Sequence, residues 1–302
     1  MPRPSESASA VQSGSFASRL GQAAASKGNP CSVGLDPDPA LMPPWLRNAA
    51  PGEMLARFGE IVIDSVADLV PVVKPQSAFY EAFGGEGIVA LENTLSYARR
   101  KGLIVLLDVK RGDVGSTSRA YARGYLEAGG SGLEADAITL SPYLGRDSLE
   151  PFAEAARTFG KGVFVCVMTS NPGAAAVQKM DCGGMPLYRR VAEIVASLAD
   201  ADSGGETYSP VGIVAGATYA EESLELRELL PRSIILVPGI GAQGGASAHL
   251  RVLIGPSGHG AIVNSSRAVD YPNEDCSDEG RYRASIRRAA EAFVRTVLES
   301  SS

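Results

Sequence analysis

Histidine is scarce in this chain, with only His249 and His259 among 302 residues. This scarcity excludes several kinds of site. No HExxH motif is present, no Cys/His cluster has zinc-site spacing, and a Ser-His-Asp triad would need one of these two residues. His249 lies in a predicted helix and His259 precedes a short apolar run, so we expect both to be structural. Acid–base chemistry must therefore rest on lysine and aspartate.

Cysteine and basic charge are also limited. The four cysteines are widely spaced without a CxxC pair, and Cys31 and Cys166 lie in apolar runs as small buried hydrophobes, which predicts a reduced, cytoplasmic protein. A net charge of −6 with no basic stripe argues against a nucleic-acid partner. The arginines between 281 and 288 recur at helical spacing and are predicted to form a solvated helix face.

Long apolar runs are absent as well. None approaches the roughly 20 residues needed to cross a bilayer, so we expect no membrane partner. The Ser/Ala-rich segment through Ser26 lacks the apolar core of a secretion signal.

Eight short apolar runs alternate with stretches of helical character, such as 91–100 and 188–198. Their spacing of about 25 to 50 residues suits βα units. No GxGxxG follows the first run, as a dinucleotide-binding fold would require. The pattern predicts one α/β domain, a (β/α)8 TIM barrel over 29–300, behind an N-terminal extension or helix over 1–28. The runs are 31–35, 70–73, 103–107, 137–140, 162–168, 211–215, 234–237 and 260–263.

Three segments are longer than a minimal barrel needs. Segments 37–51 and 171–186 follow predicted strands and belong to the catalytic face, where we expect them to enclose a substrate. Segment 200–210 precedes a strand, so it belongs to the opposite face and is predicted to be inert.

The most informative segment is 106–113, with the sequence LLDVKRGD. It follows a continuous apolar run typical of a buried parallel strand. Because strand side chains alternate, Asp108 and Lys110 are predicted to point to the same side, roughly 7 Å apart along the backbone. Asp113 follows after Gly112 has ended the strand geometry. A buried charge persists only when it is paired or serves a ligand. On spacing alone, a solvated charge group beyond a strand end is an equal alternative.

The other strand ends favour the functional interpretation. Ligands of a (β/α)8 barrel bind where its strands end. The first two runs are followed by Asp36 and Lys74, and the third by Asp108 and Lys110. A barrel with a purely structural role has no reason to place a charge at each of these ends. The fifth run is followed by a polar segment that contains Ser170.

A phosphate site is predicted at the last two strand ends. Pro238 begins a Gly-rich segment in which Gly244 and Gly245 let backbone N–H groups approach an anion. Arg267 follows the next strand and can make a charge-assisted contact. A Gly-rich loop alone is more often only a turn, and the arginine strengthens the interpretation.

Together these residues resemble the orotidine 5′-phosphate decarboxylase family. The Asp108-x-Lys110-x-x-Asp113 pattern is similar to that family's catalytic motif, and Lys74 completes its Asp/Lys network. The likeness spans about residues 30–268. The DxKxxD element is shared with related sugar-phosphate decarboxylases, whereas the full set with Gln243 and Arg267 is specific. Three further segments resemble a longer bacterial subgroup, often called the mycobacterial type: GLDPDP at 34–39, KPQ at 74–76 and MTSNPG at 168–173.

The resemblance implies a role for each position. Asp36 and Lys74 would bind the ribose hydroxyls, and Lys74 would also pair with Asp108. Asp108 would face the scissile carboxylate, and Lys110 would donate the proton that replaces it. The remaining implied contacts are Asp113 and Thr117 to the ribose of the neighbouring subunit's ligand, Ser170 to the pyrimidine, and Gln243 and Arg267 to the phosphate end, with Pro238 and Gly244 also in the binding set.

The resemblance also implies a homodimer whose active sites are shared across the interface. Two departures are visible. Val114 stands where isoleucine is common, and the segment 171–186 makes phosphate-gating contacts hard to place.

The implied chemistry needs neither a cofactor nor a metal. Loss of CO2 from C6 of orotate leaves a carbanion that no adjacent carbonyl delocalises. An ammonium held about 4 Å away stabilises that charge by on the order of 4 kcal/mol at an effective dielectric near 20. A neighbouring carboxylate disfavours the substrate anion and keeps the lysine protonated.

Two alternatives stay open at this point. A metal-dependent enzyme of the same superfamily would use the motif aspartate to bind Mg2+ and stabilise an enediolate formed from a keto-sugar phosphate. A catalytically silent nucleotide-binding barrel is the second. We would expect such a descendant to have lost a charge from the network, and none is missing.

Overall fold

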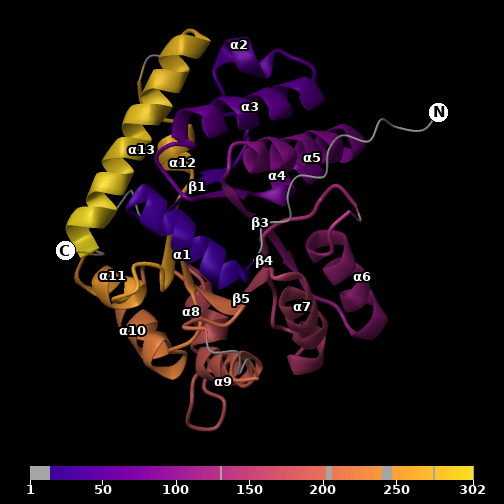
Figure 1. The fold of residues 1–302 in the computed structure, drawn as a ribbon, viewed down its shortest axis with the longest axis vertical. Coiled ribbons are helices and arrows are strands. Elements are labelled where there is room, and N and C mark those ends of the chain that lie inside the picture. Colours follow the sequence, from indigo (N-terminus) through magenta and orange to yellow (C-terminus); the bar gives the residue numbers. More distant parts are fainter. Residues whose placement is uncertain (1–13, 130, 202–205, 240–246, 275, 302) are drawn as a thin grey trace.

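Eight parallel strands close into a barrel in chain order, with β8 pairing back onto β1 (Figure 1). The structure is a computed structural model that describes residues 14–129, 131–201, 206–239, 247–274 and 276–301. The predicted (β/α)8 TIM barrel, a single α/β domain, is confirmed. The strands are β1 (Cys31–Leu35), β2 (Val72–Pro75), β3 (Ile104–Arg111), β4 (Ala137–Leu140), β5 (Gly162–Met168), β6 (Val211–Ala215), β7 (Ile235–Pro238) and β8 (Ala261–Ser265).

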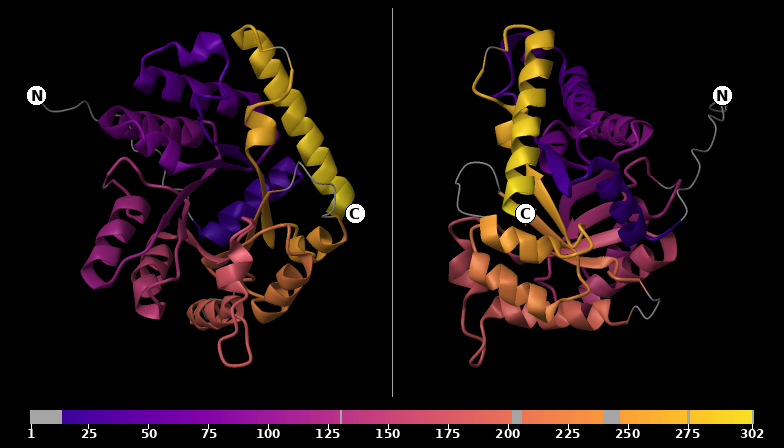
Figure 2. Two further views of the ribbon diagram at one scale, coloured as in Figure 1. Left: turned by 180° about the vertical axis from the view of Figure 1, so that it is seen from behind. Right: turned by 60° about the vertical axis from the view of Figure 1, so that its left-hand side comes forward.

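Helices surround the barrel and connect successive strands (Figure 2). The predicted helical stretches 91–100 and 188–198 lie within α5 and α9. The helices are α1 (Phe16–Lys27), α2 (Pro44–Arg47), α3 (Pro51–Val66), α4 (Ser77–Glu81), α5 (Gly84–Arg100), α6 (Gly115–Leu126), α7 (Arg146–Phe159), α8 (Ala174–Gln178), α9 (Leu187–Ala199), α10 (Ala220–Leu229), α11 (Ser247–Ile254), α12 (Arg267–Asp270) and α13 (Glu279–Ser301).

The strand boundaries differ most from prediction where polar residues continue a strand. The predicted runs coincide with β1, β4, β5 and β6. β3 runs on from its apolar residues through the charged segment to Arg111. An apolar run marks the buried part of a strand, whereas backbone pairing with a neighbour can continue past it. Asp108 and Lys110 therefore belong to the strand itself, whereas Asp113 follows it.

Helix α1 lies across one mouth of the barrel (Figure 1). Its Phe16 and Leu20 join the buried apolar cluster inside the barrel, where Phe16 makes an edge-to-face contact with Phe164 at 5.9 Å. Its Arg19 forms a buried ion pair with Asp136 at 2.6 Å. Asp136 lies just before β4 begins, so α1 packs at the amino-terminal ends of the strands. The helix therefore closes the mouth of the barrel opposite to the carboxyl ends of the strands.

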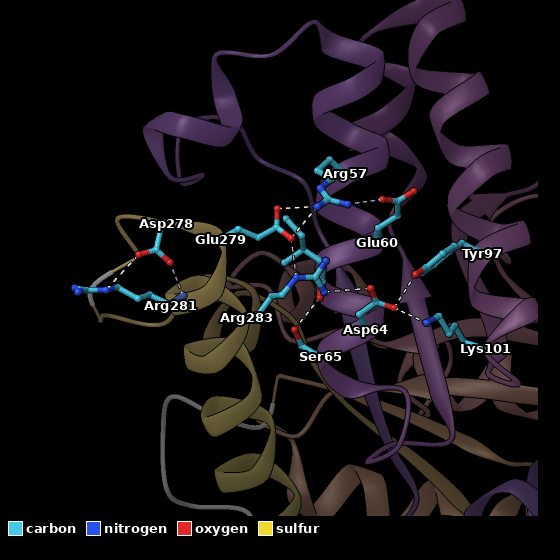
Figure 3. Close-up of polar contacts among 11 residues, drawn as sticks. Arg57, Glu60, Asp64, Ser65, Tyr97, Lys101, Asp278, Glu279, Arg281 and Arg283 are labelled. Carbon is cyan, nitrogen blue, oxygen red and sulfur yellow. Dashed lines mark hydrogen bonds and ion pairs between the residues drawn. The ribbon is translucent and has the colours of Figure 1, made fainter.

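Helix α13 is fastened to α3 by ion pairs (Figure 3). Arg283 contacts Asp64 at 3.1 Å and Glu279 at 2.9 Å, and Arg57 of α3 bonds Glu279 at 2.8 Å. The predicted solvated face holds for Arg281 and Arg288, which are exposed, but not for Arg283 and Arg287, which are partly buried; Arg287 pairs with Asp68. Each partly exposed pair contributes little on its own.

The two histidines lie away from the charged residues at the carboxyl ends of the strands. His249 is buried in α11, and the His259 ring packs edge-to-face on Tyr208 at 5.2 Å. Among the residues that the structure describes, no helix is both long enough and apolar enough to cross a membrane.

Candidate active site

The site is built from residues that lie two positions after an apolar layer inside the barrel, toward the carboxyl ends of the strands. Because side chains alternate along a strand, the residue two positions after an interior side chain also points inward. The apolar layer contains Val72, Leu106, Ala137, Phe164 and Ile262. Two residues later, the same strands present Lys74, Asp108, Thr139, Cys166 and Asn264. These five residues line a cavity of about 730 Å3 at the carboxyl ends of the strands.

Asp108 is the centre of the polar network in this cavity. Its Oδ2 accepts hydrogen bonds from Lys74 Nζ at 3.1 Å and Gln76 Nε2 at 3.0 Å. Its Oδ1 accepts from Lys110 Nζ at 2.6 Å and Thr139 Oγ1 at 2.8 Å. Burial alone would raise the pKa of Asp108, but the two ammonium groups outweigh it and hold the pKa far below its usual range. Asp108 is therefore an anion at any working pH.

Lys74 is the buried cation of the network. Burial by itself would lower the pKa of this ammonium, but the carboxylates of Asp108 and Asp36 outweigh it and raise the pKa. Lys74 stays charged although it is almost completely enclosed. The predicted pairing of Lys74 with Asp108 is present in the structure.

Lys110 is the exposed cation of the network. Its side chain is 49% exposed although Nζ pairs with Asp108, and Lys110 lines the open cavity. The two side chains share a side, as predicted. The backbone departs from strand geometry earlier than expected, although β3 continues to Arg111: Lys110 has φ of 44°, in the left-handed region, two residues before Gly112. Among the described residues, Lys110 alone adopts a positive φ without being glycine.

Asp36 lines the cavity, and its backbone is held by Asp270 of α12 and by Tyr271, which follows that helix. Its backbone N–H donates to Asp270 Oδ2 at 3.2 Å, and Tyr271 Oη donates to the Asp36 carbonyl at 2.7 Å. Asp270 is fully buried. Burial and the neighbouring Asp36 carboxylate raise the pKa of Asp270 well above its ordinary value, and burial also raises the pKa of Asp36.

We expect Asp270→Asn to stabilise the protein increasingly as pH rises. A carboxyl with a raised pKa in the folded state contributes its stability below its ordinary value of 3.8 and loses it as pH rises toward the folded pKa. Asparagine does not titrate, and its Oδ1 can still accept the Asp36 N–H. Near neutral pH the gain should be on the order of 1 kcal/mol. Thermal unfolding from pH 4 to 8 measures it.

The matched control for this prediction is the exposed Asp200, which lies at the end of α9. Asp200→Asn should leave the pH dependence of the melting temperature unchanged. An Asp270→Asn protein with the wild-type pH dependence, or with lower stability at pH 8 than at pH 5 relative to wild type, would contradict the prediction.

The predicted phosphate and pyrimidine residues gather at the rim of the same cavity. Ser170 follows β5, Pro238 ends β7, and the exposed Arg267 begins α12 after β8. All three line the cavity. Gln243 and Gly244, also predicted for this end, lie outside the described residues.

Asp113 and Thr117 do not line this cavity. Asp113 follows β3 and accepts the Val114 N–H through Oδ1 at 2.7 Å, and Thr117 is exposed on the first turns of α6. The structure thus brings together Asp36, Lys74, Asp108, Lys110, Ser170, Pro238 and Arg267, and it leaves the other two outside.

Several cavity residues were missed by the sequence reasoning. Gln76 belonged to a recognised segment but received no role, and Cys166 was expected to be only a buried hydrophobe. Its thiol faces the cavity, and burial raises its pKa to about 11, so it is not a ready nucleophile. Thr139 lies within the apolar run 137–140, and the polar residue near the end of this fourth strand was the signal that could have identified it.

Comparisons with known proteins agree with this geometry. Residues 33–269 match the family described as orotidine 5′-phosphate decarboxylase / HUMPS. The chain is 43% identical over 289 residues to orotidine 5′-phosphate decarboxylase of Rhodopirellula baltica, covering 91% of this chain and 96% of that protein. It is 39% identical to the Corynebacterium efficiens enzyme, covering 92% and 96%. The structure of Leishmania donovani OMP decarboxylase superposes with a TM-score of 0.74 at 30% identity, covering 95% and 98%.

Proposed function

Because this chain belongs to the orotidine 5′-phosphate decarboxylase family, a carboxy-lyase family of pyrimidine biosynthesis, we propose that Lys110 is its proton donor and carbanion-stabilising group. The reaction removes the C6 carboxylate of orotidine 5′-monophosphate (OMP) as CO2 and leaves uridine 5′-monophosphate (UMP). The observation that carries the proposal is the ion pair between Asp108 and Lys110 in the cavity, with the Lys110 side chain half exposed. A cation is thereby held at the place where the substrate enters.

The proposed reaction breaks one carbon–carbon bond and forms one carbon–hydrogen bond. The electron pair of the broken bond stays on C6 while CO2 departs. The Lys110 ammonium stabilises this pair and then gives its proton to C6. Neutral Lys110 regains a proton from water, which its exposed side chain can reach. Each step balances within the protein, the substrate and solvent.

Asp108 is proposed to act on the substrate before the bond breaks. Its low pKa keeps it negative beside the incoming carboxylate, so the bound substrate is destabilised relative to the transition state, in which that charge leaves as neutral CO2. Lys74 and Gln76 fix the second oxygen of Asp108, which prevents the carboxylate from turning away. The preorganised charges thus favour the transition state over the bound substrate.

Binding energy from the rest of the nucleotide holds the carboxylate in this unfavourable place. We assign Asp36 and Lys74 to the ribose hydroxyls, Ser170 to the pyrimidine and Arg267 to the phosphate. These assignments are supported by their common cavity and by its size, which suits a nucleotide. Pro238, Gln243 and Gly244 complete the proposed binding set.

Treatment with EDTA should leave the decarboxylation of OMP unchanged. The motif aspartate of a metal-dependent relative would ligate Mg2+, but both oxygens of Asp108 are already engaged by two ammonium groups, an amide and a hydroxyl. Ammonium groups at this position repel a divalent cation. Among the described residues, no group of three or more His, Cys, Asp or Glu is placed to hold a metal.

The measurement is ultraviolet monitoring of OMP conversion by purified protein, with and without chelator. A mock preparation carrying Lys110→Ala controls for contaminating activity. No conversion by the untreated protein would refute the proposed function. Conversion that is lost with EDTA and restored by Mg2+ would favour the metal-dependent alternative.

A homodimer with shared sites is also part of the proposal. Asp113 and Thr117 lie outside their own cavity, and exposed apolar residues follow the paired strands β3 and β4. These are Val114 after β3 and Tyr143 and Leu144 after β4, with Tyr143 87% exposed. Large apolar side chains exposed at the ends of neighbouring strands suit a partner surface. A cytoplasmic location is proposed as well, supported by four free cysteine thiols.

A further inference from the structure

The pairing of β3 with β4 is interrupted where the proposed catalytic residues lie. Leu107 pairs with Ile138 and Arg111 pairs with Leu140. Between these two points β3 advances four residues (111 − 107) while β4 advances two (140 − 138). Two extra residues are therefore accommodated in β3, as in an enlarged β-bulge. The bulge contains Asp108, Val109 and Lys110.

A bulge leaves backbone N–H groups without their regular partners, and a buried unpaired N–H is costly. Here one side chain replaces the missing partners. Thr139, the only β4 residue between the two pairing points, accepts the N–H of Val109 at 3.0 Å and the N–H of Lys110 at 2.9 Å through Oγ1. Thr139 is 1% exposed, so water does not compete for these contacts.

The same hydroxyl also holds Asp108. Thr139 Oγ1 donates its hydrogen to Asp108 Oδ1 at 2.8 Å. A hydroxyl has one donor and two acceptor sites, so all three are used within the bulge. The left-handed φ of Lys110 is unfavourable for a residue with a side chain and persists only when its surroundings enforce it. The two accepted N–H bonds provide that enforcement.

We propose that Thr139 is a positioning residue that fixes the bulge and thereby sets both the Asp108 carboxylate and the Lys110 backbone for decarboxylation. The inference rests on the proposed function, since it concerns how Lys110 is held. It assigns Thr139 no contact with the reacting carbon. Its effect is on the placement of the two charged groups relative to each other.

The test compares Thr139→Val, which keeps the shape and removes the hydroxyl, with Thr139→Ser, which keeps the hydroxyl. We expect Thr139→Val to lower kcat about 100-fold, the size of effect that a misplacement of about 1 Å produces. KM should change less than about threefold, because the proposed ribose and phosphate contacts are untouched. Thr139→Ser should retain kcat within about fivefold of wild type.

A purely structural role would lower the melting temperature without this split between kcat and KM. Affinity for UMP should therefore be measured on each variant and should stay near the wild-type value. If Thr139→Val does not fold, Thr139→Ala serves in its place, with Thr139→Ser again as the rescue. Wild-type kcat without the hydroxyl would overturn the inference, and so would a serine variant as impaired as the valine variant.

The wild-type protein separates this inference from the proposed function. If it fails to decarboxylate OMP, the function is wrong. If it is active, Lys110→Ala is inactive and Thr139→Val is fully active, only the positioning role is wrong.

Discussion

Replacing Lys110 by alanine is expected to lower kcat by at least about 10⁴-fold, since one group supplies both general-acid and electrostatic stabilisation. The proton donor to C6 is lost, and the negative charge that develops there is left beside Asp108 without its nearest cation. Steady-state and single-turnover conversion of OMP would measure the loss.

Nucleotide binding should survive this substitution. Asp108 keeps its contacts with Lys74, Gln76 and Thr139, so the buried network does not collapse. We expect the dissociation constant for UMP, measured by calorimetry, to remain within about tenfold of wild type. Lys101→Ala removes a lysine at the opposite end of β3 and should leave turnover unchanged. Substantial turnover by Lys110→Ala would exclude the assigned role.

Mixing two inactive variants should restore activity if Asp113 acts across a dimer interface. Asp113→Ala retains Lys110, and Lys110→Ala retains Asp113. In a mixed dimer, one site combines the intact Lys110 of one subunit with the intact Asp113 of the other. Random exchange between equal amounts gives about a quarter of the wild-type activity, because half the dimers are mixed and each has one complete site.

The control mixture is Lys110→Ala with Asp108→Ala. Both residues lie on β3 of one subunit and contact each other, so no mixed dimer regains a complete site. Exchange can be confirmed by isolating dimers that carry two different tags. Absence of recovery in isolated mixed dimers of the first pair would refute the cross-subunit placement of Asp113.

Much of the barrel was predictable because its strands are short apolar runs separated by helices. Charged residues at the ends of such runs also predicted which side chains meet, since parallel strands end at one mouth. Asp36, Lys74 and Asp108 were placed correctly by this reasoning although they are distant in sequence.

The parts that escaped prediction depend on contacts between elements. Alternation assumes a regular strand, and the bulge around Lys110 is visible only when β3 is paired with β4. Asp270 reaches Asp36 because α12 packs behind β1, which no local pattern reveals. Arg283 and Arg287 were predicted to be solvated because their acidic partners, Asp64 and Asp68, are more than 200 positions away in the chain.

Helix α1 closes one mouth of the barrel. Because Phe16 and Leu20 fill one mouth of the barrel, the nucleotide, carbon dioxide and the replacement proton of the proposed reaction all use the opposite mouth. Carbon dioxide formed in the proposed reaction must then leave past the bound nucleotide, or it leaves only after the nucleotide has dissociated. The closed mouth thus imposes an order on the release of carbon dioxide and nucleotide that a barrel open at both ends would not require.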